Sequence, residues 1–241
     1  AEYPPGLFPD QAANGEDALE ILDGRLQVFS PRNNGRESLF FYVQALTVGL
    51  FGIGVWQIFL GSALVGIATV AATYAAGRRV LGVGPSLLAA FFLATNPWHV
   101  TLSRTGFRAV TAPLFIALAL LCIARVLKPR EGVPRRRDAV LAGLFTGLGL
   151  YTYASFRAFI VFLLICGSWA LVRAAWVRSF RSRVRALAFR AGLAAFSASV
   201  VVAPLLVFFA RHPDFVVERA AHVSIFNPEL NDGSPLRTFV R

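Results

Sequence analysis

A carboxylate near the start of the chain is the first residue with a side chain suited to catalysis. Asp10 stands in "FPDQA", ahead of the stretch "QAANGEDALEIL". A carboxylate can act as a general base and take the proton from a hydroxyl or amine nucleophile. The same position suits a helix N-cap, where the carboxylate accepts hydrogen bonds from the first backbone N–H groups. The spacing favours the cap, and the two roles are compatible.

A charged pair forms the second candidate group. Arg36 and Glu37 follow Asn33 and Asn34 in "NNGRESLFFY", where an Asn-Gly turn signal precedes an apolar run. Charges at the point where a chain enters a membrane are costly unless they are paired or functional. We therefore keep Asn34, Arg36 and Glu37 as candidate substrate-binding residues, with a simple turn as the alternative.

Two later stretches add candidate phosphate contacts. His99, Arg104 and Arg108 stand in "WHVTLSRTGFR", and the four-residue spacing of the two arginines predicts that they share one face of a helix. Two arginines can clamp a phosphate, although arginines at a helix end also extend along the apolar surface to reach water. Tyr153 and Arg157 stand in "YTYASFR", where Arg157 is either an anchor or a third phosphate contact.

Metal and cofactor motifs are not evident in the sequence. The three histidines lack the spacing of metal ligands, and no phosphate-binding loop of a nucleotide enzyme is present. The sequence therefore indicates no definite cofactor and leaves a divalent metal open.

The elements that must position these residues are membrane helices. The chain of 241 residues is 56% hydrophobic and 15% charged, whereas a soluble domain has about 25% charged residues. Several apolar blocks approach the roughly 20 residues that cross a bilayer, and the short alternating segments of a β-barrel are absent. The net charge of +11 does not indicate nucleic-acid binding, because the arginines lie at the ends of apolar blocks. We predict an all-α, polytopic transmembrane bundle.

About six spans are expected from the apolar blocks. They are 55–77, 84–102 (interrupted at Asn96-Pro97), 109–127, 139–156, 158–172 and 191–210. The connections 125–137 and 173–190 each carry six Lys or Arg, which predicts that both are cytoplasmic. Residues 1–54 then lie outside, and the short apolar segment 38–54 dips into the outer leaflet without crossing.

The predicted organisation has three parts. Residues 1–54 form an extracytoplasmic loop with an amphipathic helix on the membrane surface, residues 55–210 form the bundle, and residues 211–241 begin another outer loop. Most carboxylates of the first loop are expected to be solvated: Glu16, Asp17, Glu20 and Asp23. The chain begins without Met and ends in "SPLRTFVR", which predicts a fragment of a longer membrane protein.

The order of these features resembles a known group of enzymes. An early Asp, a short amphipathic helix, the "GRESLFFY" entry and "GRRVLGVGPSLLAAFFLATNPWHVTLSR" are similar to the lipid-linked-sugar glycosyltransferases of the GT-C fold. The nearest groups are the dolichyl-phosphate-mannose–protein mannosyltransferases and the bacterial aminoarabinose transferases. The resemblance covers most of residues 7–130 and rests on the order of these features and on local similarity of sequence.

The resemblance implies a role for several residues. In that family an acidic residue of the first outer loop is the proposed catalytic base, which corresponds to Asp10. Many members have Asp-Glu there, where this chain has Asp10-Gln11, so Gln11 joins the candidate substrate-binding residues. Another Asp that many members carry after the "SR" element is absent, and Arg108 stands in that stretch.

The resemblance further implies an inverting glycosyltransferase of the inner membrane. It would move a sugar from a polyprenyl-phosphate carrier to a protein or glycolipid acceptor at the outer face. The alternative is a transporter or flippase for a lipid-linked anion, which predicts ionisable residues deep within the spans. No Asp, Glu, Lys or Arg occurs in 55–77, 84–102, 109–124, 139–156 or 191–210.

Overall fold

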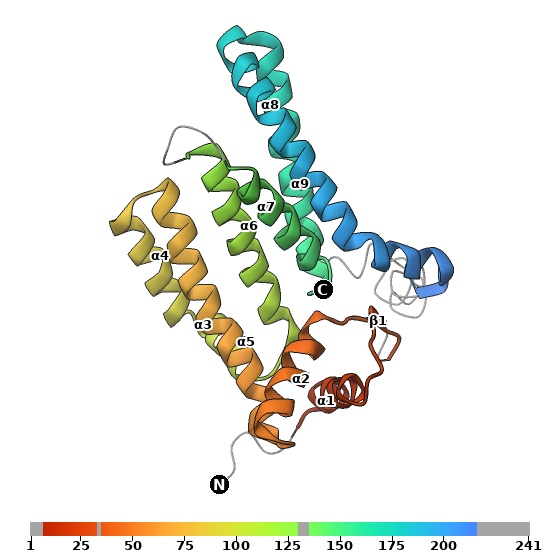
Figure 1. Cartoon of the computed structure of the whole chain (residues 1–241). Helices are drawn as coiled ribbons and strands as arrows, with labels where there is room; N and C mark the ends of the chain where they lie inside the picture. The colour runs from red at the N-terminus through yellow and green to blue at the C-terminus, as the bar shows by residue number, and fades with distance from the viewer. Residues whose placement is uncertain (1–6, 33–34, 130–134, 216–241) are drawn as a thin grey trace, which may run out of the picture.

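The fold is almost entirely helical, in a computed structural model that describes residues 7–32, 35–129 and 135–215 (Figure 1). The first part holds α1 (Pro9–Leu22), β1 (Phe29–Ser30), β2 (Arg36–Glu37) and α2 (Leu39–Phe51). The bundle holds α3 (Val55–Val80), α4 (Val83–Thr95), α5 (Pro97–Arg104), η1 (Arg108–Val110), α6 (Thr111–Leu127), α7 (Arg136–Gly149), η2 (Ala154–Phe156), α8 (Arg157–Trp176) and α9 (Arg178–Arg211). The two strands pair antiparallel, with Phe29 opposite Glu37 and Ser30 opposite Arg36.

Among the described residues, four helical segments are long and apolar enough to cross a membrane, which confirms a polytopic helical fold. They are Val55–Val80, Arg108–Leu127, Ala154–Trp176 and Leu187–Arg211. The basic segment expected at 173–190 is divided between the end of α8 and the start of α9, which meet at Val177. Helix α2 has 13 residues and is therefore about 20 Å long, shorter than the roughly 30 Å of a bilayer core.

Two of the six expected spans differ from the expectation. The segment 84–102 is two helices, because Asn96 leaves the helical conformation and its side chain accepts the N–H of His99 to cap α5. Pro97 occupies the first turn of α5, where its missing N–H costs nothing. The segment 139–156 is helical only to Gly149, after which residues 150–153 turn back into η2. Both passes are therefore shorter than the helices beside them.

Small residues allow α7 to pack closely against α9. Gly143 and Gly147 lie four apart on α7, and a Cβ on Gly143 would meet the backbone oxygen of Ala194 at 2.1 Å. A Cβ on Gly147 would meet the Cβ of Val201 at 2.8 Å. Glycines at this spacing bring helix backbones together in membranes. The two glycines of "GLFTG" thus allow α9 to lie close against α7.

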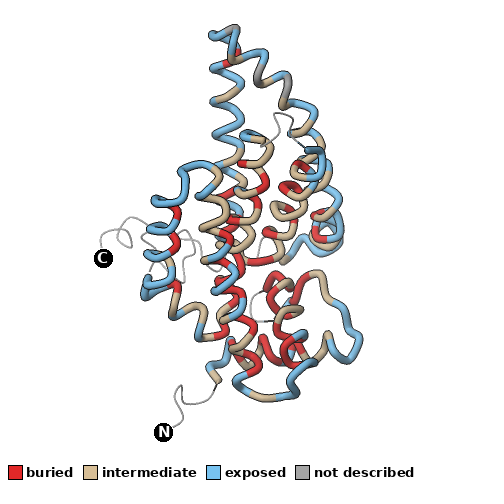
Figure 2. The backbone as a smooth tube through the Cα atoms, turned by 60° about the vertical axis from the view of Figure 1, so that its left-hand side comes forward, coloured by how far each residue is buried: buried red, intermediate tan, exposed pale blue. Residues whose placement is uncertain are grey.

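Burial is concentrated where the first loop meets the bundle (Figure 2). Phe40 and Phe41 of α2 pack with Val65 of α3 and Val110 of η1 in one buried cluster. Helix α3 packs against α4, α5 and α6, and α6 packs against α7. In contrast, α8 and α9 are largely exposed, as suits helices that face lipid or further protein.

We expect Gly143→Ala to destabilise the bundle, because the new methyl group meets backbone that has no rotamer to adopt. Overpacking of this kind costs about 1–3 kcal/mol. Gly167→Ala in α8 is the matched control, since nothing lies within 4 Å of its added Cβ. Thermal unfolding of the detergent-solubilised protein should show a lower Tm for Gly143→Ala only. An unchanged Tm would contradict the close α7–α9 contact.

Candidate active site

A buried carboxylate joins three parts of the chain at the end of the bundle that carries the first loop. Glu37 is 1% exposed, and its Oε2 accepts a hydrogen bond from Nη1 of Arg108 at 2.8 Å. Its Oε1 lies 3.7 Å from Nη2 of Arg157. The guanidinium of Arg108 also lies over the ring of Tyr153, 5.0 Å from its centroid. Four predicted site residues therefore form one cluster, although they are far apart in sequence.

Backbone contacts explain why these residues meet. The N–H of Leu39, at the start of α2, donates to the carbonyl of Tyr151 at 3.1 Å, so the β2–α2 junction lies against the α7–α8 connection. Phe156 is fully buried in that connection and brings Arg157 to the first turn of α8. Each element thus delivers one charged or aromatic side chain to Glu37.

Arg36 points to a second, buried cluster on α1. Its Nη1 donates to Oδ1 of Asn14 at 2.6 Å, and its Nη2 donates to Oδ2 of Asp17 at 2.7 Å. Its Nε donates to the carbonyl of Arg32 at 3.3 Å, and the side chain is only 3% exposed. Since all three nitrogens have partners within the protein, Arg36 is poorly placed to bind an external phosphate.

Burial pushes the pKa values of this ion pair toward each other. Burial raises the pKa of Asp17, against the opposing charge of Arg36 and the hydrogen bond from Ser30. Burial lowers the pKa of Arg36, against the charges of Asp17 and Asp10. Burying this ion pair costs free energy of desolvation. Removing one partner costs more, because the other charge then stays buried without compensation. It therefore fixes α1 against the β1–β2 hairpin.

Asp10 lies in the first turn of α1 and is exposed. The expected N-cap role is wrong, because Phe8 is the N-cap and Pro9 begins the helix. The carboxylate stays at the surface, and its charge acts on Arg36.

Gln11 connects α1 to the bundle. Its Oε1 accepts the N–H of Phe8 at 2.9 Å, and its Nε2 donates to the carbonyl of Thr105 at 2.6 Å. Gln11 is 5% exposed, so its amide replaces two solvent contacts at once. A carboxylate here would face a carbonyl oxygen that offers no proton. The amide is therefore the form that this contact requires.

The Gln11–Thr105 hydrogen bond holds the start of α1 against the turn that follows α5. Asp10 precedes Gln11 and Arg104 precedes Thr105, so the two charged residues flank one short contact. Arg104 is exposed, at the end of α5. The expectation that Arg104 and Arg108 share a helix face is wrong, because α5 ends at Arg104 and Gly106 turns the chain with a φ of 65°. The turn sends Arg108 inward to Glu37 instead.

His99 lies away from this cluster. Its Nε2 is 3.3 Å from the carbonyl oxygen of Gly66, and the residue is 9% exposed. The Oγ of Ser62 donates to the carbonyl of Ser103 at 2.9 Å and accepts the N–H of Gly106 at 3.2 Å. His99 therefore helps to seat α5 on α3, which positions the turn before Arg108.

The remaining expectations have mixed outcomes. Asp17 was expected to be solvated, and that is wrong, since it is fully buried. Asn34 lies outside the described residues. Within the described residues, no group of three or more His, Cys, Asp or Glu is placed to hold a metal ion.

Comparison with known proteins identifies the family. Residues 38–202 match the family described as dolichyl-phosphate-mannose-protein mannosyltransferase, which is more than half of the chain. The chain belongs to this family. A curated relative, the putative mannosyltransferase YycA of Bacillus subtilis (strain 168), is 27% identical over 125 residues, covering 52% of this chain and 18% of that protein.

Two solved structures share the fold of this mannosyltransferase-family chain. Apo ArnT from Cupriavidus metallidurans matches with a TM-score of 0.69 and 21% identity, over 95% of this chain and 44% of ArnT. ArnT bound to undecaprenyl phosphate matches with a TM-score of 0.66 and 20% identity, over 87% of this chain and 38% of ArnT. The chain thus spans less than half the length of these relatives. The predicted resemblance to GT-C enzymes is confirmed.

Sequence reasoning missed the polar face of α1. The buried residues of this helix are Gln11, Asn14, Gly15, Asp17 and Ala18. Gln11, Asn14, Gly15 and Ala18 follow the i, i+3, i+4, i+7 spacing of one helix face. The apolar Leu22 at the end of this helix is instead 47% exposed. An amide-rich face with small residues was the available signal of a helix packed on other protein.

We expect Asp17→Ala to lower the free energy of unfolding of the first loop by about 3–5 kcal/mol. The substitution leaves the Arg36 guanidinium buried without its counter-charge. Glu16→Ala is the matched control. Its carboxylate is 68% exposed and its pair with Arg32 spans 3.4 Å, so its loss should cost at most about 1 kcal/mol. Hydrogen–deuterium exchange of residues 9–22 measures the difference. Equal exchange in the two variants would contradict the buried pair.

Proposed function

We propose that this chain carries the catalytic part of a membrane glycosyltransferase that takes a sugar from a polyprenyl-phosphate carrier. The supporting observation is the hydrogen bond between Gln11 and Thr105, which holds the start of α1, where Asp10 lies, against the turn that follows Arg104. A base for the acceptor and a cation for the leaving phosphate would then lie at the same end of the bundle. Family membership and the ArnT-like fold support the same donor class.

Asp10 is the proposed general base. An acceptor hydroxyl or amine would attack the anomeric carbon of the donor sugar while its proton passes to the Asp10 carboxylate. The bond from that carbon to the carrier phosphate would break in the same displacement, which inverts the anomeric configuration. The exposure of Asp10 suits this role, because the carboxylate is accessible to an acceptor.

Arg104 and Arg157 are the proposed phosphate contacts. Arg157 is 63% exposed at the side chain and keeps donors available, since its 3.7 Å contact with Glu37 involves one nitrogen. Arg104 is exposed in the last turn of α5. Arg108 is 8% exposed and committed to Glu37 and Tyr153, so we assign it to positioning the cluster. Positioned cations stabilise charge that develops on a leaving group.

An apolar groove is the proposed place of the prenyl tail. It encloses about 640 Å³ and is lined by residues of α6, α7, α8 and α9. Ile160 and Leu164 line it and lie three and seven residues after Arg157, on the same side of α8. A carrier with its phosphate at Arg157 would therefore lay its tail along this groove. The membrane is proposed to be the plasma (inner) membrane, with residues 1–54 and 211–241 outside, and the acceptor to be a protein or glycolipid.

We expect Asp10→Asn to lower sugar transfer by about 10²- to 10⁴-fold, the range of a lost general base. Glu16→Gln removes a neighbouring exposed carboxylate of α1 and should retain activity. Transfer from a polyprenyl-phosphate sugar is measured in the full-length protein, with thermal unfolding to show that both variants fold. Full activity of Asp10→Asn would remove Asp10 as the base.

We expect Arg157→Gln to lower kcat/KM for the lipid donor by about 10- to 100-fold, because a hydrogen bond to a charged group contributes about 1.5–3 kcal/mol. Arg185→Gln on α9 loses the same charge at the opposite end of the bundle and serves as the control. The same transfer assay applies, run at several donor concentrations. Equal kinetics in the two variants would remove Arg157 from the donor site.

A further inference from the structure

A basic pocket lies at the opposite end of the bundle from Glu37. It encloses about 510 Å³, and the described residues that line it lie at or next to the ends of α3, α6 and α7: Tyr74, Ala75, Arg78, Arg79, Leu121, Arg125, Pro129, Arg135, Arg137 and Asp138. Its volume falls within the range of small-molecule sites, about 300–1,000 Å³. Five arginines and one carboxylate line it, so the lining carries a net positive charge.

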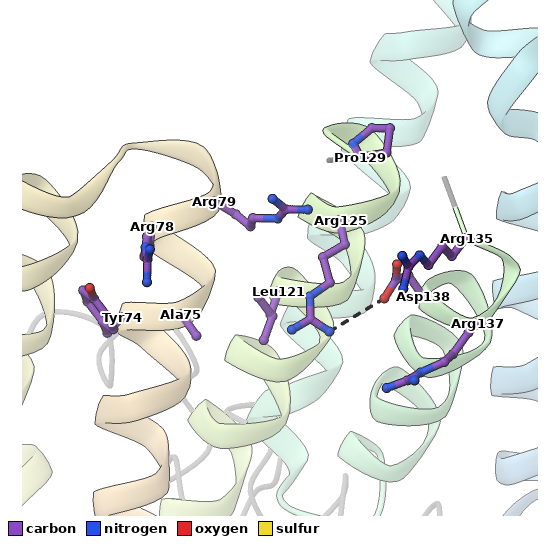
Figure 3. Close-up of a pocket in the computed structure, with 10 residues that line it drawn as sticks. All are labelled: Tyr74, Ala75, Arg78, Arg79, Leu121, Arg125, Pro129, Arg135, Arg137 and Asp138. Atoms are coloured by element: carbon purple, nitrogen blue, oxygen red, sulfur yellow. Dashed lines mark ion pairs between the residues drawn. The ribbon is translucent and has the colours of Figure 1, made fainter. Parts of the chain in front are cut away.

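The arginines reach the pocket from separate elements (Figure 3). Arg78 and Arg79 stand in the last turn of α3, Arg125 in the last turn of α6, and Arg137 in the first turn of α7. In the close-up, Arg79 extends from α3 toward α6, and Arg137 extends from α7 toward Arg125. These cations come from separate parts of the sequence, and the fold brings them together.

One carboxylate offsets only part of this charge. Asp138 lies 3.7 Å from Nη1 of Arg125. Among the residues that the structure describes, Arg78, Arg79 and Arg137 have no ion pair. Like charges that line one concavity repel, and the repulsion is relieved when an anion enters. The positive-inside rule accounts for basic residues on this side of the membrane, but it does not account for their position around a pocket.

The depth of the pocket matches the level of lipid phosphates. Helix α3 has 26 residues and is therefore about 39 Å long, which exceeds the roughly 30 Å of the hydrocarbon core. A helix of this length that is centred on the hydrocarbon core would have its last turn in the headgroup region. The Nζ of Lys128 donates to the carbonyl of Val80 at 3.3 Å and ties the ends of α6 and α3 together at this level.

We propose that this pocket binds a phosphate group at the inner membrane surface, supplied by the headgroup of an anionic phospholipid. Guanidinium groups bind phosphate oxygens with paired, charge-assisted hydrogen bonds. Basic pockets between membrane helices on the cytoplasmic side suit anionic headgroups. The site is independent of the proposed sugar transfer, which lies at the other end of the bundle.

The test compares two double variants of the full-length protein. Arg79→Gln with Arg137→Gln removes two pocket cations that have no carboxylate partner among the described residues. Arg181→Gln with Arg185→Gln removes the same charge from the start of α9, outside the pocket. Native mass spectrometry of the detergent-solubilised protein, titrated with phosphatidylglycerol, measures binding. We expect affinity at least tenfold lower for the pocket variant and within twofold of the parent for the control.

Two further arms settle the source of the phosphate. Phosphatidylcholine should bind weakly to every variant, because its headgroup has no net charge. Pyrophosphate is titrated in parallel: pocket-dependent binding of pyrophosphate without binding of phosphatidylglycerol would overturn the lipid occupant. An equal loss of phosphatidylglycerol in both double variants would overturn the site, because charge alone would then explain binding. Should the double variant unfold, Arg137→Gln, an exposed position, gives the same comparison against Arg185→Gln.

Discussion

The burial of the Glu37 carboxylate is the constraint on which the outer end of this protein depends. A buried charge is tolerated only with partners, and here the partners come from η1 and the start of α8. Its strand neighbour Arg36 faces the other way, because successive strand residues point to opposite sides. One two-residue strand thus serves two clusters, binding α1 through Arg36 and the bundle through Glu37.

This arrangement divides the arginines into two kinds. Arg36 and Arg108 are buried and hold the architecture, whereas Arg104 and Arg157 are exposed and remain available to a ligand. The same division separates Asp17 from Asp10 on α1. A site of this kind keeps its reactive groups at the surface while paired charges beneath them set their positions.

The sequence was sufficient for the parts that follow from composition and charge. Apolar blocks and the arginine-rich connections predicted a polytopic helical bundle, and four helices in the described part of the chain are long enough to span a membrane. The break at Asn96-Pro97 was visible from Pro97. Pairings between distant residues were not visible, because nothing in "GEDALE" marks Asp17 as the partner of Arg36. The shared face of Arg104 and Arg108 failed because Gly106 ends the helix between them.

A structure of the full-length protein with a bound polyprenyl phosphate tests the central claim most directly. The account predicts that the phosphate contacts Arg104 and Arg157, within reach of Asp10, while Glu37 keeps its bond to Arg108. A phosphate bound elsewhere, with Arg104 and Arg157 left in solvent, would contradict it.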